Sequence, residues 1–277
     1  LRDRQGQASV LLHRGEDHLR LGAFGKACGD LSRALDRAVP GSADWRRATA
    51  GLLLARMRGY SSDLGPAIEE FLAAAKGQGD MKTLAHASHV AALWLLRRRR
   101  WGDAGVKLKV ALALSATCGE ELLQGELFAL LGAAELLQGE LETGRSWFAA
   151  AEAFHRSGRR PVHESLSRYR RTASLLMEPG HLVFLEELAA AGPLPEEREP
   201  RVWWHLLHAA GDLQDGEHAS AVRHWRKACG NGLGLLWDIN LCFVLQHVHL
   251  RIGSSSAKEG IRKELQRIYG QRHRTAV

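Results

Sequence analysis

Apolar residues recur along the chain with the spacing of one face of an α-helix. An early copy of the pattern places Phe24, Ala27, Leu31 and Ala34 three or four positions apart. Residues at that spacing share one side of a helix, so the stripe predicts an amphipathic helix that buries this side. A second helical stretch precedes it, with the small residue Gly15 at its middle. We expect two antiparallel helices that approach each other closely over small side chains.

The same stripe returns five more times. The first alanine of the stripe, at position 27, has counterparts at positions 67, 104, 144, 184 and 221, so successive copies lie 37 or 40 residues apart. A seventh, poorer copy surrounds Ala257 and Ile261. The preceding helical stretch again has a small residue at its middle in most copies, with Thr172 as the exception; these residues are Ala55, Ala92, Gly132 and Ala209. The five further stripes are Leu64, Ala67, Phe71 and Ala74; Trp101, Ala104, Leu108 and Ala111; Leu141, Gly144, Phe148 and Ala151; His181, Phe184, Leu188 and Ala191; and His218, Ala221, Trp225 and Ala228.

Composition agrees with a helical protein. The chain has 44 Leu and 39 Ala against 23 Val, Ile and Thr together, which favours helices and leaves few residues for a sheet. Hydrophobic residues make up 45% and charged residues 25%, as in folded soluble proteins. No run of eighteen apolar residues occurs, so the sequence predicts no membrane span.

The repeated helix pairs resemble the tetratricopeptide repeat (TPR) family over about residues 8–270. The small residue in the first helix, the short turn, the aromatic residue, the Ala and the second large apolar residue carry the resemblance. The period is a few residues longer than the usual 34. The resemblance implies an all-α solenoid, a right-handed superhelix of about six to seven antiparallel helix pairs forming a single domain over residues 1–277. The expected repeats span residues 8–40, 44–79, 81–117, 120–157, 162–192, 201–230 and 235–270.

The chain is basic, with a net charge of +7 that suggests an acidic partner. Arginines and lysines gather in residues 97–100, 156–171 and 258–274. Solvated helix faces and helix ends are the commoner explanation of such clusters. The start of the sequence has neither Met nor an apolar signal region, which favours a fragment or a trimmed chain.

The sequence contains no motif that points to catalysis. Phosphate-loop, zinc-protease, nucleophile-elbow and EF-hand patterns are all missing, so we expect no enzyme and no cofactor. Two histidine pairs, His86 with His89 and His205 with His208, have the spacing of one helix face, but a pair supplies only half of a tetrahedral metal site. The four cysteines are scattered, which favours a reduced, cytoplasmic compartment and no metal; they are Cys28, Cys118, Cys229 and Cys242.

The TPR resemblance also implies a concave groove, lined by first helices, that binds a peptide. The groove positions carried over by register are basic in the first half and aromatic in the second. This mixture fits a protein or peptide with acidic residues and apolar anchors. For Trp203, packing between repeats is an equally good explanation. The predicted partner-binding residues are Arg20, Arg56, His86, His89, Arg97, Tyr169, Trp203 and Leu206.

The leading hypothesis is a non-catalytic protein-protein interaction module, acting as a scaffold, an adaptor or the sensing arm of a larger regulator. An RNA-binding or other nucleic-acid-binding helical repeat is the first alternative, because the arginine clusters attract phosphates. The regulatory domain of a multidomain enzyme or transcription regulator is the second. Self-association stays open.

Overall fold

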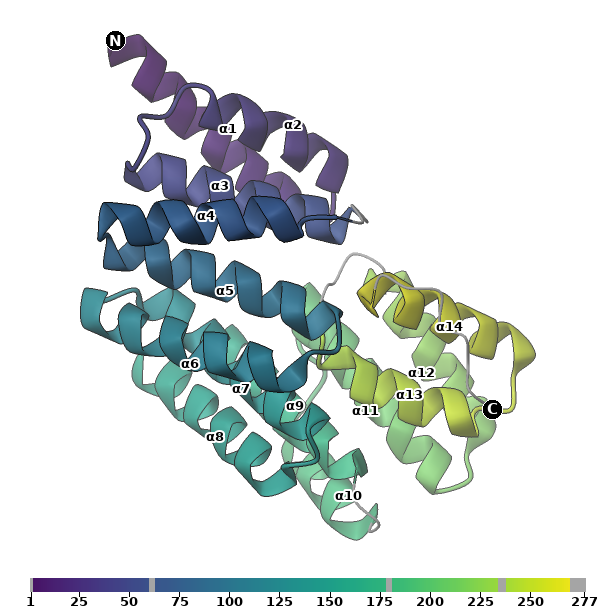
Figure 1. The fold of residues 1–277 in the computed structure, drawn as a ribbon. Helices are drawn as coiled ribbons and strands as arrows, with labels where there is room; N and C mark the ends of the chain where they lie inside the picture. Colours follow the sequence, from purple (N-terminus) through teal and green to yellow (C-terminus); the bar gives the residue numbers. More distant parts are fainter. Residues whose placement is uncertain (1, 60–62, 178–180, 234–237, 270–277) are drawn as a thin grey trace. The chain divides into compact units, whose positions relative to one another are not determined.

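The computed structural model describes residues 2–59, 63–177, 181–233 and 238–269, and in these ranges it holds helices and no strand. No helix in these ranges is long and apolar enough to cross a membrane. The α-helices follow one another in pairs along the chain (Figure 1). The pairs are α1 (Arg2–Arg20) and α2 (Phe24–Leu35); α3 (Ala43–Arg58) and α4 (Gly65–Gln78); α5 (Met81–Arg97) and α6 (Trp101–Cys118); α7 (Glu121–Leu137) and α8 (Leu141–Ser157); α9 (Pro161–Ser174) and α10 (His181–Ala190), with the short 3-10 helix η1 (Leu175–Met177) between them; α11 (Arg198–Gln214) and α12 (His218–Gly230); and α13 (Leu241–Arg251) and α14 (Ser255–Tyr269).

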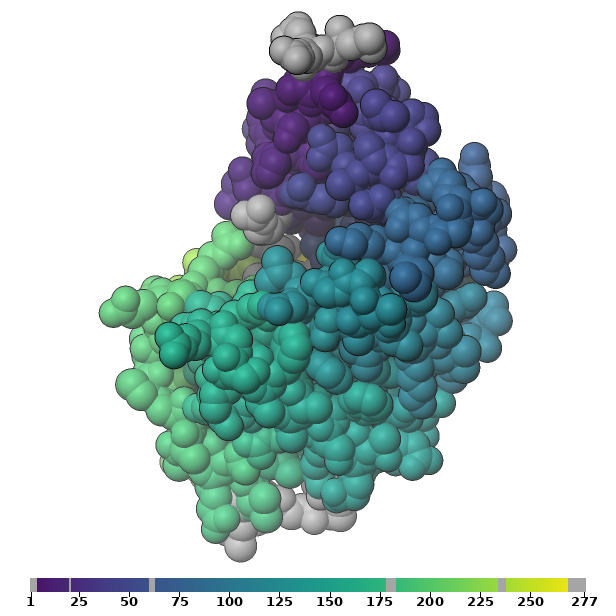
Figure 2. All heavy atoms as spheres, turned by 90° about the vertical axis from the view of Figure 1, so that its left-hand side faces the viewer, coloured from purple at the N-terminus to yellow at the C-terminus, as the bar shows by residue number. Residues whose placement is uncertain are grey.

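These pairs make the fold an all-α solenoid, as the sequence predicts. Each expected repeat overlaps one of the seven described pairs, although α1 begins at Arg2 and α11 at Arg198, before the expected bounds of 8 and 201. The chain divides into two compact units, unit 1 with residues 1–127 and unit 2 with residues 128–277. Within each unit, residues close in sequence lie together on the face that Figure 2 shows. The single domain over residues 1–277 stays a prediction.

The buried stripe is confirmed in five of the six copies. In these copies the Ala or its counterpart and the two apolar residues that follow are buried. In α4 the prediction is wrong by one position, because Ile68 and Ala75 are buried while Ala67 and Ala74 are half-buried. Turning α4 this way buries the isoleucine in place of a smaller alanine and removes more apolar area from water.

Glycines in first helices set how closely a pair can pack. A Cβ atom placed on Gly15 of α1 would lie 2.6 Å from Cγ of Leu31 in α2. A Cβ on Gly132 of α7 would lie 2.7 Å from Cε1 of Phe148 in α8. Leu31 and Phe148 have no exposed surface, so neither can move aside. The small residues that the sequence singled out are therefore the points at which the two helices of a pair approach each other.

We expect Gly15→Ala to lower the free energy of unfolding by about 1–3 kcal/mol, because the added methyl group overpacks the contact with Leu31. Gly29→Ala is the matched control in the same helix pair. Gly29 lies exposed on α2 with open space around its Cα, so the alanine should stabilise by about 0.5–1 kcal/mol through helix propensity. Urea unfolding measures both changes, and equal effects of the two variants would contradict the close approach.

Eight of the turns share one backbone feature. The residue two positions before the next helix has a positive φ in each of them. Glycine adopts this conformation without strain, whereas a residue with a Cβ is strained by about 1–2 kcal/mol. Six of the turns have glycine at this position and two have arginine; the residues are Gly22, Gly41, Gly79, Gly119, Gly139, Gly216, Arg99 and Arg159.

We expect Arg159→Gly to raise the free energy of unfolding by about 1 kcal/mol, because it relieves a φ of 52° at an exposed site. The opposite change, Gly139→Ala, should lower it by a similar amount, since φ is 91° there and no atom within 4 Å would meet the new Cβ. Both substitutions lie in residues 128–277. Chemical denaturation measures the free energy of unfolding of each variant, and the values are compared when the m-values are equal. A stabilising Gly139→Ala would refute this account of the turns.

Candidate functional site

Two of the predicted partner-binding residues in unit 1 present surface. Arg56 is exposed near the end of α3. His86 on α5 is half-buried, and its Nε2 lies 3.8 Å from Oε2 of Glu120. Burial of the His86 ring, helped by the nearby charge of His89, lowers its pKa. Both residues belong to first helices, so the prediction for them stands.

Of the other three predicted residues of unit 1, two are buried and one has a side chain outside the described residues. His89 is only 4% exposed and its Nε2 lies 3.4 Å from Oε1 of Glu126. Arg97 is buried at the end of α5. These two side chains offer a partner little surface. Arg20 ends α1, but its side chain lies outside the described residues.

In unit 2, the predicted aromatic anchors are buried. Trp203 and Leu206 on α11 have no exposed surface, and Tyr169 on α9 is 2% exposed. Of the two explanations for Trp203, packing is the one that its burial supports. As placed, these three side chains leave no surface to a partner, because neighbouring helices already cover them.

One neighbouring helix is α13, which lies across first helices of unit 2. It packs against α9 and α11 (Figure 1), and its Phe243 joins a buried cluster with Ala129 and Leu136 of α7 and Phe148 of α8. The surface that α9 and α11 present to α13 is called the first-helix face of unit 2 below. This face therefore already holds an apolar helix from the same chain.

A buried ion pair fixes the start of α13. Nε and Nη2 of Arg170, on α9, donate to Oδ2 of Asp238 at 2.9 and 2.7 Å. The other oxygen of Asp238 accepts hydrogen bonds from the backbone and side-chain nitrogens of Asn240. The two partners are 16% and 8% exposed, so water screens the pair weakly. The pair joins residues 68 positions apart, and sequence patterns gave no sign of it.

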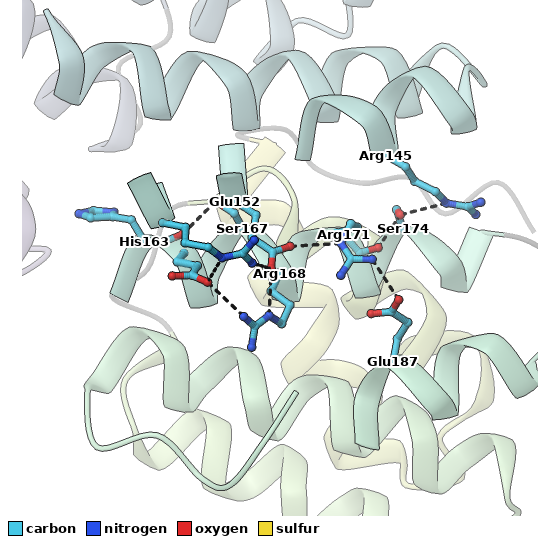
Figure 3. Close-up of polar contacts among 10 residues, drawn as sticks. Arg145, Glu152, His163, Ser167, Arg168, Arg171, Ser174 and Glu187 are labelled. Carbon is cyan, nitrogen blue, oxygen red and sulfur yellow. Dashed lines mark hydrogen bonds and ion pairs between the residues drawn. The ribbon is translucent and has the colours of Figure 1, made fainter. Parts of the chain in front are cut away.

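The remaining arginines of the 156–171 cluster mostly meet carboxylates. Glu152 of α8, with a side chain 10% exposed, lies within ion-pair distance of Arg156, Arg168 and Arg171 at 2.8, 3.2 and 3.4 Å (Figure 3). Arg171 continues to Glu187 of α10 at 3.0 Å. One carboxylate thus ties α8 to α9, and one arginine ties α9 to α10.

Glu164 completes the network. It accepts from Arg156 at 2.9 Å and from Arg168 at 3.3 Å, so three glutamates face three arginines. About two turns earlier on α8, Arg145 donates to the hydroxyl of Ser174 on α9 (Figure 3). The network balances its own charge and holds three helices together, which leaves little of its positive charge to attract an acidic partner.

Three histidines gather between α11 and α12. Nδ1 of His205 lies 3.1 Å from Nδ1 of His224, and the His208 ring lies 3.6 Å from the ring of Trp204. Burial, followed by the charge of His224, lowers the pKa of His205 and of His208 to about 4. Burial also lowers the pKa of His224, while Asp212 opposes the shift. Within the described ranges, no group of three His, Cys, Asp or Glu side chains is placed to hold a metal ion.

This histidine cluster predicts acid sensitivity. Because the pKa of His205 and His208 is about 4 in the fold and about 6.5 in the unfolded chain, the unfolded chain binds more protons between these values. Stability should therefore fall as the pH drops from 6.5 towards 4, by about 1–2 kcal/mol for each histidine between pH 7 and pH 5. Lys227, Arg201 and Arg223 lie near the cluster and favour the neutral rings further.

The variant His208→Gln should flatten this fall, since one proton fewer binds on unfolding. Urea unfolding at pH 7, 6 and 5 measures the slope, with His13→Gln at an exposed site of α1 as the control. An unchanged slope in His208→Gln would show that this ring does not titrate as described.

Comparisons with known proteins agree with the fold. No family model matches the sequence, and no curated protein matches it. Among solved structures, the chain is similar to PilF of Pseudomonas aeruginosa, a TPR-containing protein, with a TM-score of 0.52 and 17% sequence identity over 95% of this chain and 99% of that one. At this identity the similarity shows a TPR-like helical repeat and nothing about partners.

Proposed function

We propose that the chain is a non-catalytic protein-interaction module, a scaffold, an adaptor or the sensing arm of a larger regulator, that binds protein segments on its first helices. The observation that carries this proposal is α13, an apolar helix lying on the first-helix face of unit 2. It supports the idea that first helices of this solenoid accommodate an added segment. Rigid helix pairs at regular spacing are well suited to such binding.

The side chains suggest what the segment carries. In unit 1, Arg56 is exposed on α3, so an acidic residue of a partner finds a cation there. His86 on α5 is half-buried and its lowered pKa favours the neutral ring, so it offers a hydrogen-bonding group. In unit 2, the contact with α13 combines the Arg170 and Asp238 ion pair with a buried Phe243. Both observations support a partner with an acidic residue and apolar anchors.

Nucleic-acid binding has less support. Its motivation was the arginine clusters, and the cluster at residues 156–171 is largely neutralised by Glu152, Glu164 and Glu187. Arg262 and Arg267 of the last cluster are likewise paired with Glu259 and Glu264. Paired arginines attract phosphates less than free ones, because the carboxylates offset their charge.

Photo-crosslinking tests the proposal. A photoreactive phenylalanine at position 56 or 86 should capture a protein, whereas one at Val106, 63% exposed on the second helix α6, should capture far less. Arg56→Glu should weaken binding of the captured partner by about tenfold, because it replaces attraction by repulsion. Mass spectrometry identifies the molecules crosslinked at each position.

Capture of RNA instead of protein from position 56, or equal capture from position 106, would contradict the proposal. Lys76→Glu, an exposed charge reversal on α4, is the matched control for Arg56→Glu. It alters the net charge by the same amount on a second helix, so an equal loss of affinity would point to a nonspecific charge effect.

A further inference from the structure

We infer that α13 is a built-in, displaceable occupant of the first-helix face of unit 2, and that a protein segment with an acidic residue followed by an apolar helix replaces it. This inference rests on the proposed function, because it names the partner chemistry and the regulation of that binding. In the closed form α13 blocks the face. Binding of a partner therefore requires α13 to leave.

The first argument comes from the order of the helix pairs. In a solenoid each pair contacts only the pairs next to it. The last pair, α13 and α14, should then meet only the pair α11 and α12. Instead α13 also packs against α9, and its Phe243 joins the cluster of Leu136 and Phe148 in the pair α7 and α8. The helix keeps its place in the stack beside α11 and also reaches two earlier pairs.

The second argument comes from burial. From Asp238 to Val248 every side chain is buried except that of Gln246. The first helices α5 and α7 are enclosed in a similar way, since residues 87–93 and 129–136 are all buried. α14, by contrast, exposes a polar side and keeps a narrow buried stripe that includes Ile261 and Ile268. α13 is therefore covered on almost every side by other helices.

The third argument is that the contact is imperfect. Oδ1 of Asn240, Nε1 of Trp203 and Oγ1 of Thr172 are buried without a hydrogen-bond partner. They belong to the start of α13 and to the two helices on which it lies. Of the three, Asn240 belongs to the segment that packs, and burial of its Oδ1 without a hydrogen-bond partner weakens the packed state. A partner that satisfies one of these atoms gains an advantage over α13.

The contacts of α13 define the chemistry of the replacing segment. Asp238 supplies a carboxylate to Arg170, and Phe243, five residues later, supplies an aromatic anchor to the cluster with Leu136 and Phe148. We therefore expect a segment with Asp or Glu about five residues before a large apolar side chain in a helix. The carboxylate fixes the register, and the apolar side chain supplies most of the affinity.

A labelled peptide of residues 238–252 serves as the probe, with fluorescence anisotropy on the full chain as the measurement. Phe243→Ala in the chain weakens its own α13, so the chain should bind the peptide about tenfold or more tightly than the unaltered chain does. Asp238→Asn removes the ion pair with little change in volume and should act in the same direction. Gln246→Ala, at an exposed position of the same helix, is the matched control.

Arg170→Ala added to Phe243→Ala should weaken peptide binding about tenfold, because the peptide's own carboxylate then lacks its partner. A peptide carrying Phe243→Ala should not bind. Hydrogen exchange on the unaltered chain should show α13 opening before α9 and α11.

The inference is overturned if Phe243→Ala and Asp238→Asn leave peptide binding unchanged, if α9 and α11 unfold together with α13, or if the freed helix docks on a second copy and the chain dimerises. These outcomes are separate from a failure of the proposed function. That failure would appear as a loss of protein capture at positions 56 and 86 in unit 1.

Discussion

The close approach of two helices at a small residue is the constraint on which the fold depends. Where Gly15 meets Leu31 and Gly132 meets Phe148, the missing Cβ lets a large side chain fill the space beyond. A helix pair closed in this way buries one stripe of each helix and leaves its other sides to neighbouring pairs or to water. Repetition of this contact gives a stack of pairs, and the stack gives surfaces made of first helices.

Charge is used mainly inside that framework. An isolated buried carboxylate is costly, but Glu152 is stabilised because arginines from its own helix and from α9 reach it together. The same residue types that make the chain basic therefore join α8, α9 and α10. Arg170 differs from its neighbours on α9, since its carboxylate comes from beyond α12, and it connects the repeat framework to α13.

Helix pairs, their boundaries and most of the buried stripes could be predicted from sequence, because they follow from periodic local patterns. Ile68 escaped the prediction because Ala67 fits the same stripe, and only the volume of the isoleucine decides which side faces inwards. Tyr169, Trp203 and Leu206 were placed correctly on first helices, but their burial depends on what lies over them. That cover involves contacts between residues distant in sequence, such as Arg170 with Asp238, and periodicity carries no information about those.

A signal for α13 nevertheless exists in the sequence. Residues 241–245 are apolar without interruption and cover more than one helical turn, unlike the one-sided stripes of α2 or α8, and such a segment has to be enclosed. The partner helix α14 covers only one side of α13, so the last pair cannot enclose its own first helix. The helix must therefore lie against other first helices, and those of unit 2 supply both the apolar cluster around Phe148 and the cation that meets Asp238. Packing of α13 therefore covers the first-helix face at the same time. Whatever opens the face has to compensate for the apolar side chains of α13 that then meet water.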